Sequence, residues 1–316
     1  MNTKHLIKGL HHVTATVNDA QEDYHFYTQL LGLRLVKKTV NFENNQVYHF
    51  YYGNELGEPG TIMTTFPYKG QNVRQGVKGT GQVAITAFSI DVSALAFWKT
   101  RLTEHQVPFQ ETLKFGNTSL LFEDPSGLEI ELVANTEDVR SPWESATIPA
   151  EMAIQGIFNA TLSIAAPHPT FEFLIHEFGL QQIAQEGNIT RFAALNGEPG
   201  QYVDIRHDAN LDRGKNGIGT VHHLAWRVEN DEALVTLRNR IANELGLNVT
   251  EVKDRKYFHS IYFRMPGKVL FEIATIPPGF AVDESVENLG QKLQLPDWEE
   301  VNRAQIESVL PEISHP

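Results

Sequence analysis

Two histidine pairs are the residues best suited to chemistry. His11-His12 and His222-His223 lie 211 residues apart, and each pair falls in a run of β-branched and apolar residues typical of a strand. Imidazole is a common metal ligand and a general acid or base near neutral pH. Because the chain has no cysteine, any bound metal must be held by His, Asp or Glu side chains, carbonyl groups or water.

Alternation along a strand decides which histidine of each pair faces a cavity. Neighbouring side chains point to opposite faces, so only one of two adjacent histidines can enter the cavity unless the strand bulges. His11 lies on an apolar face, which should pack on a helix, and so does His222. His12 lies on the opposite face together with Thr14, and His223 is also on the face opposite its apolar neighbours. The pattern predicts that His12 and His223 face the cavity.

A carboxylate completes a candidate metal site. In the strand-like run from 269 to 274, Glu272 lies on the face opposite Phe271, where a buried charge requires a partner. Two histidines and one carboxylate match the facial triad that binds non-haem Fe(II) and leaves coordination positions open, and Mn, Zn or Ni could use similar ligands. A single His-His pair is more often a surface or hydrogen-bonded pair, but its recurrence at the same register favours a metal.

Four segments repeat one pattern of a strand, a helix and further strands, at about residues 10–66, 82–133, 156–208 and 221–274. One such unit cannot bury both its helix and its sheet. We therefore predict an α+β fold of four βαβββ modules that form two cupped mixed β-sheet barrels. Residues 1–140 are predicted to be an N-terminal half of two modules, 141–155 a linker, 156–276 a C-terminal half of two modules, and 277–316 a tail.

The other repeats carry acids without histidines. At the position of His12, the second segment has about Val83 and the third has Asn159. At the position of Glu272, the first three segments have in turn Thr64, Glu131 and Asp204. A full metal site in the second and third segments is therefore not expected, and the role of this second cup stays open. The first segment lacks an acid, so we expect it to pair with the fourth.

Composition narrows the classes of function. The formal net charge is -13 without a basic block, which argues against binding to nucleic acid through its phosphates. The N-terminal sequence lacks the apolar core of a signal peptide, and no run approaches the length of a membrane span. We expect a cytoplasmic protein that binds neither nucleic acid nor membrane.

Several motifs resemble a known group of proteins. They are Gly9 to Thr14, Tyr52 to Thr61, Met63 to Pro67 and Pro266 to Ala274. They resemble the vicinal oxygen chelate superfamily, also called the glyoxalase/bleomycin resistance/dioxygenase superfamily, and within it the hydroquinone ring-cleaving dioxygenases. The resemblance extends over nearly the whole chain.

The resemblance implies a reaction and a cofactor. It implies Fe(II) bound by His12, His223 and Glu272, the same three residues that alternation predicts. The implied activity is that of a non-haem iron, extradiol-type enzyme that opens hydroquinone-type or catechol-type rings with O2. The implied role is quinone and hydroquinone detoxification or aromatic catabolism. The partners are then a small aromatic substrate and O2, and association as a homodimer is an open expectation.

Residues near the ligands are candidates for catalysis or substrate binding. Tyr262 is expected to face the cup and to transfer protons, with a space-filling aromatic as the alternative. His11 and His222 adjoin the ligands and could act as acids or orient them, although burial against the helices is the competing interpretation. Predicted contacts of the substrate are Thr14, Arg255 and His259.

Two other functions use the same fold. One is a glyoxalase-type isomerase or lyase that uses Zn or Ni, although such sites tend to use a fourth carboxylate or Gln ligand where this chain has Thr64. The other is a non-enzymatic protein that binds aromatic compounds and confers resistance.

Overall fold

The computed structural model describes residues 5–314, which form four βαβββ modules and a C-terminal segment. The first module comprises β1 (Leu10–Val17), α1 (Ala20–His25), β2 (Arg34–Asn41), β3 (Asn44–Gly53) and β4 (Ile62–Pro67). The second comprises β5 (Gln82–Asp91), α2 (Leu95–Glu104), β6 (Phe109–Lys114), β7 (Asn117–Glu123) and β8 (Glu129–Asn135).

The third module comprises β9 (Gly156–Ile164), α3 (His168–His176), β10 (Gln181–Glu186), β11 (Ile189–Ala193) and β12 (Tyr202–His207). The fourth comprises β13 (Thr220–Val228), α4 (Asp231–Asn239), β14 (Lys253–Asp254), β15 (Phe258–Arg264) and β16 (Leu270–Pro278). A last helix, α5 (Arg303–Val309), follows in the C-terminal segment.

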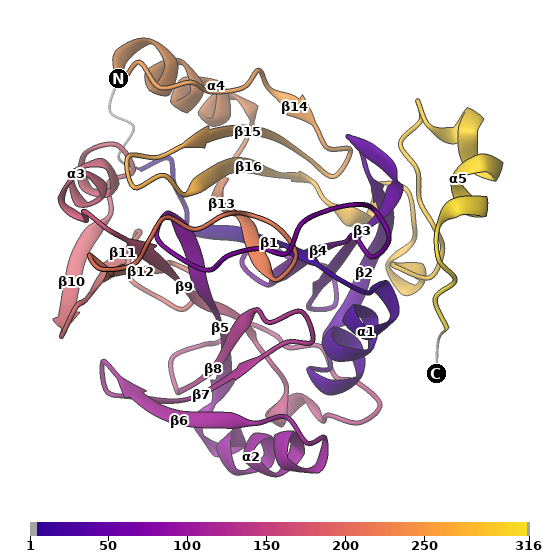
Figure 1. Cartoon of the computed structure of the whole chain (residues 1–316), viewed down its shortest axis with the longest axis horizontal. Helices are drawn as coiled ribbons and strands as arrows, with labels where there is room; N and C mark the ends of the chain where they lie inside the picture. Colours follow the sequence, from indigo (N-terminus) through magenta and orange to yellow (C-terminus); the bar gives the residue numbers. More distant parts are fainter. Residues whose placement is uncertain (1–4, 315–316) are drawn as a thin grey trace.

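The modules form two mixed sheets of eight strands each. The first sheet has the order β14-β15-β16-β13-β1-β4-β3-β2, so it joins the fourth module to the first. The second has the order β10-β11-β12-β9-β5-β8-β7-β6 and joins the third module to the second. In Figure 1 the indigo strands of the first module therefore lie beside the orange strands of the fourth. This confirms the predicted fold class, while the boundaries predicted for two halves, a linker and a tail stay a prediction.

The seam between the first and fourth modules contains two bulges. β1 and β13 are antiparallel, and Leu10 pairs with Trp226 whereas His12 pairs with Ala225, which leaves His11 as the extra residue on β1. A second shift, after Thr14 has paired with His223, leaves His222 as the extra residue on β13. Bulges re-aim side chains. The simple alternation that placed His11 and His222 on the helix side therefore fails at these two residues.

The outer faces of both sheets and the helices share one apolar core. Phe178, directly after α3 of the third module, packs on Trp226, Phe263 and Phe271 of the first sheet, with ring centroids 5.4 to 6.4 Å apart. One continuous cluster of buried apolar residues includes members of both sheets. No helix within residues 5–314 is long and apolar enough to cross a membrane.

The C-terminal segment is fastened along the edge strand β2. The backbone N–H of Gln294 donates to the carbonyl of Lys38 at 2.9 Å. Lys37 is fully buried, and its Nζ lies 2.6 Å from Asp283 Oδ1 and 2.5 Å from Glu284 Oε2. A buried ammonium requires such partners. These contacts cover an edge that would otherwise be open, and Figure 1 shows α5 beside β2 and β3.

A buried carboxyl group joins α1 to the outer face of β3 and β4. Asp23 Oδ2 accepts hydrogen bonds from the Tyr52 hydroxyl at 2.7 Å and the Thr65 hydroxyl at 2.6 Å, whereas Asp23 Oδ1 has no partner. Burial raises the pKa of Asp23 to about 8, although the bonds from Thr65 and Tyr52 oppose the shift. The folded protein therefore keeps this side chain protonated at pH 7, while an unfolded chain ionises it near pH 4.

This difference predicts a pH-dependent contribution to stability. Because the folded state binds the proton more tightly, the contribution of Asp23 is fully present below pH 4 and is lost as the pH rises towards 8. In Asp23→Asn the neutral amide cannot ionise. We expect the melting temperature to fall less between pH 5 and pH 8 in this variant than in the unmodified protein.

Thermal unfolding followed by circular dichroism at several pH values measures this difference. Asp91→Asn is a suitable control because hydrogen bonds from Ser93 lower the pKa of Asp91, so its effect is confined to acid pH. Identical slopes for Asp23→Asn and the unmodified protein would contradict the prediction.

Candidate metal centre

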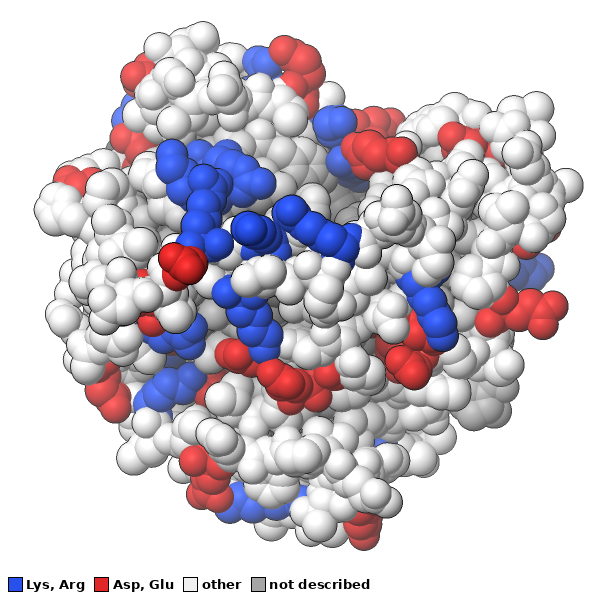
Figure 2. Space-filling view, viewed as in Figure 1, with Lys and Arg blue, Asp and Glu red and all other residues white. Residues whose placement is uncertain are grey.

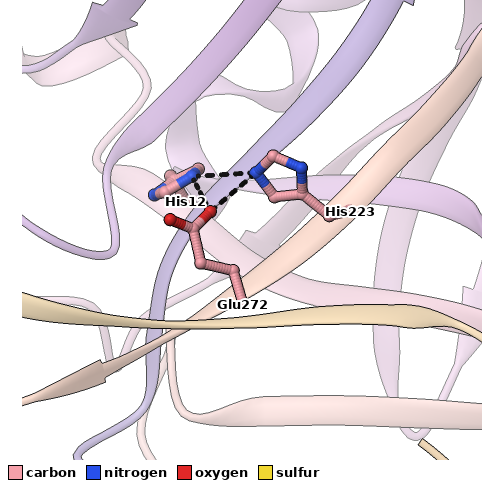
Figure 3. A group of neighbouring side chains, drawn as sticks. All are labelled: His12, His223 and Glu272. Atoms are coloured by element: carbon pink, nitrogen blue, oxygen red, sulfur yellow. Dashed lines mark hydrogen bonds and ion pairs between the residues drawn. The ribbon is translucent and has the colours of Figure 1, made fainter. Parts of the chain in front are cut away.

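Three neighbouring strands bring the predicted ligands together at the inner face of the first sheet. His12 comes from β1, His223 from β13 and Glu272 from β16 (Figure 3). Antiparallel pairing sets Thr14 opposite His223, and parallel pairing sets Ala225 beside Glu272. All three residues are at most 4% exposed. The structure therefore brings His12 next to side chains that follow it by 211 and 260 positions in the sequence.

The geometry of these side chains fits a metal cation. His12 Nε2 and His223 Nε2 lie 3.3 Å apart, and Glu272 Oε2 lies 3.0 and 2.7 Å from them. Despite these short distances, Oε2 receives no hydrogen bond of acceptable geometry and is left without a partner. A buried carboxylate oxygen without a donor is costly. Within residues 5–314 this is the only group of three such side chains whose ligand atoms lie within 4.8 Å of one another.

The electrostatics favour the protonation states that ligands need. Burial alone would raise the pKa of Glu272, but the adjacent His12 and His223 hold it well below its usual value. Burial lowers the pKa of His223, and the attraction of Glu272 offsets only part of this shift. At neutral pH the carboxylate is therefore ionised and the imidazole of His223 is neutral. These are the forms that bind metals.

Hydrogen bonds behind His12 fix which of its nitrogens is free. His11 Nε2 lies 3.2 Å from the carbonyl oxygen of Thr275, which can only accept, so this nitrogen carries the proton. Burial, followed by the effect of His12, lowers the pKa of His11 to about 3, so His11 is neutral and its Nδ1 is an acceptor. His12 Nδ1, 2.9 Å away, must then be the donor. His12 Nε2 is left with a lone pair directed to the candidate metal.

The second pair repeats this contact in part. His222 Nδ1 and His223 Nδ1 are 2.8 Å apart. His222 is less buried than His11 and lines the cavity above the three candidate ligands. Burial, with a contribution from His223, lowers the pKa of His222 to about 3, so a neutral imidazole faces the cavity.

Tyr262 holds the other oxygen of the candidate carboxylate ligand. Its hydroxyl donates to Glu272 Oε1 at 2.7 Å and accepts from Arg255 Nε at 3.1 Å. Arg255 in turn pairs with Glu43 at 3.0 Å, across the gap between β14 and the β2–β3 hairpin. Burial and the neighbouring Glu272 raise the pKa of Tyr262 well above its usual value. The phenol therefore stays protonated and orients the carboxylate.

The candidate ligands lie at the base of a cavity of about 350 Å³, a size suited to a small aromatic molecule. Its walls are largely aromatic, with side chains Phe42, His49, Tyr51, Phe66, Tyr68 and Phe258. Arg255 and Lys253 supply positive charge, and Glu43 lies against both.

Two of the predicted substrate contacts lie away from this cavity. Thr14 is fully buried and accepts a hydrogen bond from Thr64 at 2.9 Å, so its hydroxyl is directed into the sheet. His259 lies on the outer side, where its Nδ1 is 2.7 Å from Asp231 Oδ1 at the start of α4. Arg255, the third predicted contact, does line the cavity. His11 does not, and it is buried between His12 and Phe258.

His49 is a cavity residue that the sequence analysis missed. It lies on β3, and its Nε2 is 2.9 Å from the hydroxyl of Thr64. Because Thr64 donates its own proton to Thr14, His49 Nε2 is the donor to Thr64, and His49 Nδ1 carries the lone pair. Alternation gave a usable signal, since His49 and Tyr51 share the face opposite Phe50 and Tyr52, which pack on each other in the core.

The corresponding positions of the second sheet are occupied by ion pairs. Glu131 on β8 pairs with Lys114 at 2.7 Å, and Asp204 on β12 binds Arg191 through two contacts of 2.8 Å. Asn159 donates to Asp204 at 2.5 Å. The counterpart of His12 in the second module is Ile85 rather than Val83, because the pairing shifts between these two residues. In the described residues the second sheet thus satisfies its acids with side-chain cations.

Comparison with known proteins places the chain in a family. The model of the Glyoxalase/Bleomycin resistance protein/Dioxygenase superfamily matches residues 9–132. The chain is 44% identical to the protein named "Putative ring-cleaving dioxygenase MhqO" of Bacillus subtilis (strain 168), and the match covers 96% of this chain and 95% of that protein. It is 36% identical to a chlorohydroquinone/hydroquinone 1,2-dioxygenase of Sphingobium indicum, over 92% of this chain and 91% of the relative.

A solved structure agrees with these relatives. The crystal structure of a Bacillus subtilis protein named "putative dioxygenase" superposes with a TM-score of 0.94 at 43% identity, over 98% of both chains. Glyoxalase I from Zea mays shares the fold, with a TM-score of 0.62 at 12% identity, over 84% of this chain and 92% of the other. The chain belongs to the glyoxalase/bleomycin resistance/dioxygenase superfamily, and its relatives support a dioxygenase.

The contrast between the two sheets predicts where a metal binds. Glu272→Ala removes the carboxylate from the three converging side chains and should reduce the metal content from near one ion per chain to near zero. The matched control is the double variant Glu131→Ala/Asp204→Ala, which should keep its metal because Lys114 and Arg191 already occupy those positions. Metal analysis by mass spectrometry after reconstitution measures both. Halving of the content in the double variant would reveal a second site.

The hydrogen bonds behind His12 predict an effect on metal affinity. His11→Phe leaves His12 Nδ1 without its acceptor, so the protonation of the two imidazole nitrogens is no longer fixed. We expect metal affinity to fall about 10- to 100-fold, measured by competition with a chelator. In His11→Gln the side-chain carbonyl can accept the same hydrogen bond and should restore most of the affinity. Equal affinities in His11→Phe and the unmodified protein would contradict this role.

Proposed function

We propose that the protein is an Fe(II)-dependent, extradiol-type ring-cleaving dioxygenase that opens hydroquinone-type or catechol-type aromatics with O2. Its role would lie in quinone and hydroquinone detoxification or aromatic catabolism. The single observation that carries this proposal is that His12, His223 and Glu272 converge at the base of an aromatic cavity, with no fourth ligand among residues 5–314. The relatives named as ring-cleaving and hydroquinone dioxygenases support it.

The absence of a fourth ligand follows from the repeat. Thr64 pairs with Thr14 on the neighbouring strand as Glu272 pairs with Ala225, so Thr64 occupies the place that corresponds to Glu272 in the first module. Its hydroxyl donates to Thr14 and accepts from His49. Within the described residues only three side chains can then bind the metal, which leaves positions for substrate and O2. A glyoxalase-type site would need a further ligand here.

Fe(II), when bound to these three side chains, would supply the electron exchange between an aromatic substrate and O2. The chain itself supplies position and proton transfer. The aromatic walls would hold the ring flat, and Arg255 would stabilise a substrate hydroxyl that has lost its proton. Tyr262 keeps Glu272 in place and is therefore a positioning residue.

Two imidazoles can exchange protons with a substrate hydroxyl. Among residues 5–314, neither His49 Nδ1 nor His222 Nε2 has a hydrogen-bond partner. Both imidazoles line the cavity and both are neutral, because burial lowers the pKa of His49 well below its usual value and that of His222 to about 3. His49 can accept a hydrogen bond from a substrate hydroxyl through Nδ1, whereas His222, whose Nδ1 accepts from His223, can donate one through its Nε2–H.

Oxygen consumption tests the proposed activity. The protein is loaded with Fe(II) without oxygen and mixed with methylhydroquinone in air-saturated buffer. Because a dioxygenase inserts both atoms of O2 into one ring, we expect about one O2 to be consumed for each substrate molecule. Glu272→Ala should lose the uptake, whereas Glu131→Ala should retain it.

Two other outcomes would favour other functions. No uptake with any of a panel of hydroquinones and catechols would exclude the dioxygenase. In that case, turnover of glutathione adducts with Zn or Ni would favour a glyoxalase-type isomerase or lyase. Tight binding of aromatic compounds that survives both His12→Ala and Glu272→Ala would favour a non-enzymatic resistance protein.

A further inference from the structure

Two linkers between modules share a pattern of glycines. One joins β4 to β5 and contains the run Gly76-Val-Lys-Gly79-Thr-Gly81. The other joins β12 to β13 and contains the run Gly214-Lys-Asn-Gly217-Ile-Gly219. Both follow the spacing Gly-x-x-Gly-x-Gly, and both carry Lys or Arg. The resemblance suggests that they are corresponding parts of the duplicated halves.

The linkers pair with each other around an approximate two-fold axis. Val77 and Lys215 exchange both backbone hydrogen bonds, at 2.8 and 2.9 Å, so the axis passes between them. The bond from Gly76 N–H to the Ile218 carbonyl, at 2.9 Å, has its counterpart in the bond from Gly214 N–H to the Thr80 carbonyl, at 3.0 Å. The two segments therefore form one rigid unit rather than two separate loops.

Glycine is required where the linkers touch. A Cβ atom on Gly79 would lie 2.4 Å from the carbonyl oxygen of Asp212, and one on Gly217 would lie 2.4 Å from the carbonyl oxygen of Arg74. Backbone atoms cannot move aside without breaking the pairing. The close approach holds Arg74 and Arg213, one from each linker, beside a common groove.

The groove is strongly basic in an acidic protein. Its volume is about 290 Å³, and Arg74, Arg213, Lys215 and Arg264 line it without any acidic residue among the lining side chains. Within residues 5–314 none of these four cations forms an ion pair with a carboxylate; Arg74 and Arg264 donate only to backbone carbonyls, at 2.8 and 2.9 Å. Figure 2 shows Lys and Arg side chains gathered over the centre of this face, although the net charge is -13.

Four unpaired cations around one concavity repel one another, and a multivalent anion would relieve the repulsion. The backbone N–H groups of Gly76, Val77 and Gly214 are already used in the pairing of the linkers, so recognition would depend on the side chains. Guanidinium groups bind phosphate-type oxyanions through paired hydrogen bonds. The small volume of the groove and the acidic remainder of the chain disfavour an extended polyanion.

We propose that this groove is a binding site for a small multivalent oxyanion of the phosphate type, either free phosphate or a phosphoryl group on a small molecule. The site lies beside the candidate metal centre, because Arg264 pairs across strands with Leu270, which lines the metal cavity. The second linker also leads directly into β13, which carries His223. None of the residues that carry the proposed oxygenase activity lines this groove.

Titration with inorganic phosphate by calorimetry at low ionic strength tests the site. Arg74→Gln/Arg213→Gln removes one guanidinium from each linker and should weaken binding at least about tenfold. Lys292→Gln/Arg303→Gln removes the same charge from the C-terminal segment and should leave the affinity unchanged. The Lys215 side chain is exposed and forms no hydrogen bond within residues 5–314, so Lys215→Gln should weaken binding without risk to the fold. Circular dichroism checks that each variant is folded.

Further binding measurements identify the ligand and the site at which it binds. Glu272→Ala should bind phosphate like the unmodified protein, since loss of binding there would assign the phosphate to the metal centre and overturn the proposal. If phenyl phosphate binds with the same affinity as inorganic phosphate, the ligand is free phosphate. If phenyl phosphate binds more tightly, the ligand is a phosphoryl group on a small molecule. If both double variants lose the same affinity for phosphate, the effect is one of net charge, which would also overturn the proposal. Binding of single-stranded DNA without any binding of phosphate would also overturn the proposal.

Discussion

The structure around the cavity depends on one buried carboxylate. Glu272 lies in the middle of a sheet with no exposed surface, and burying an ionised carboxylate without compensation is expensive. The Tyr262 hydroxyl, 2.7 Å from Oε1, provides part of that compensation, and a metal ion shared with the two imidazole nitrogens within 3.0 Å of Oε2 would provide the rest. The seam of β1 and β13, the position of β15 and the pair of Arg255 with Glu43 all serve to bring these partners to it.

The four modules have different residues, with different partners, at the same position of the sheet. In the first, the position holds the neutral Thr64, hydrogen-bonded within the sheet, and in the fourth it holds Glu272 with two histidines. In the second and third, Glu131 and Asp204 are neutralised by Lys114 and Arg191. In these two modules a cationic side chain compensates the buried acid. At Glu272 the neighbouring side chains are imidazoles instead, and these can share the carboxylate with a metal ion.

The sequence predicts much of this site because most of it lies on regular strands. Alternation alone selects His12, His223 and Glu272, and repetition of the module identifies the fold class. Contacts across the open side of the curled sheet cannot be predicted in this way. Glu43 reaches Arg255 only because the β2–β3 hairpin closes over β14, and no local pattern records how far a sheet curls. His49 had a local signal, but its value depends on the same closure.

The alternation of side chains mispredicts the faces of His11 and His222 because of β-bulges that are part of the fold. Each is the extra residue of a bulge, and the second sheet has the corresponding shifts at Ala84 and Phe158, where there is no histidine. The bulges are therefore a property of the duplicated seam and not a response to the metal site. A bulge lets two consecutive side chains approach each other. A histidine at the bulge can then form a hydrogen bond with the histidine that follows it, and the two Nδ1–Nδ1 distances are 2.9 and 2.8 Å. The paired strands β1 and β13 can therefore supply a metal ligand and also fix its orientation.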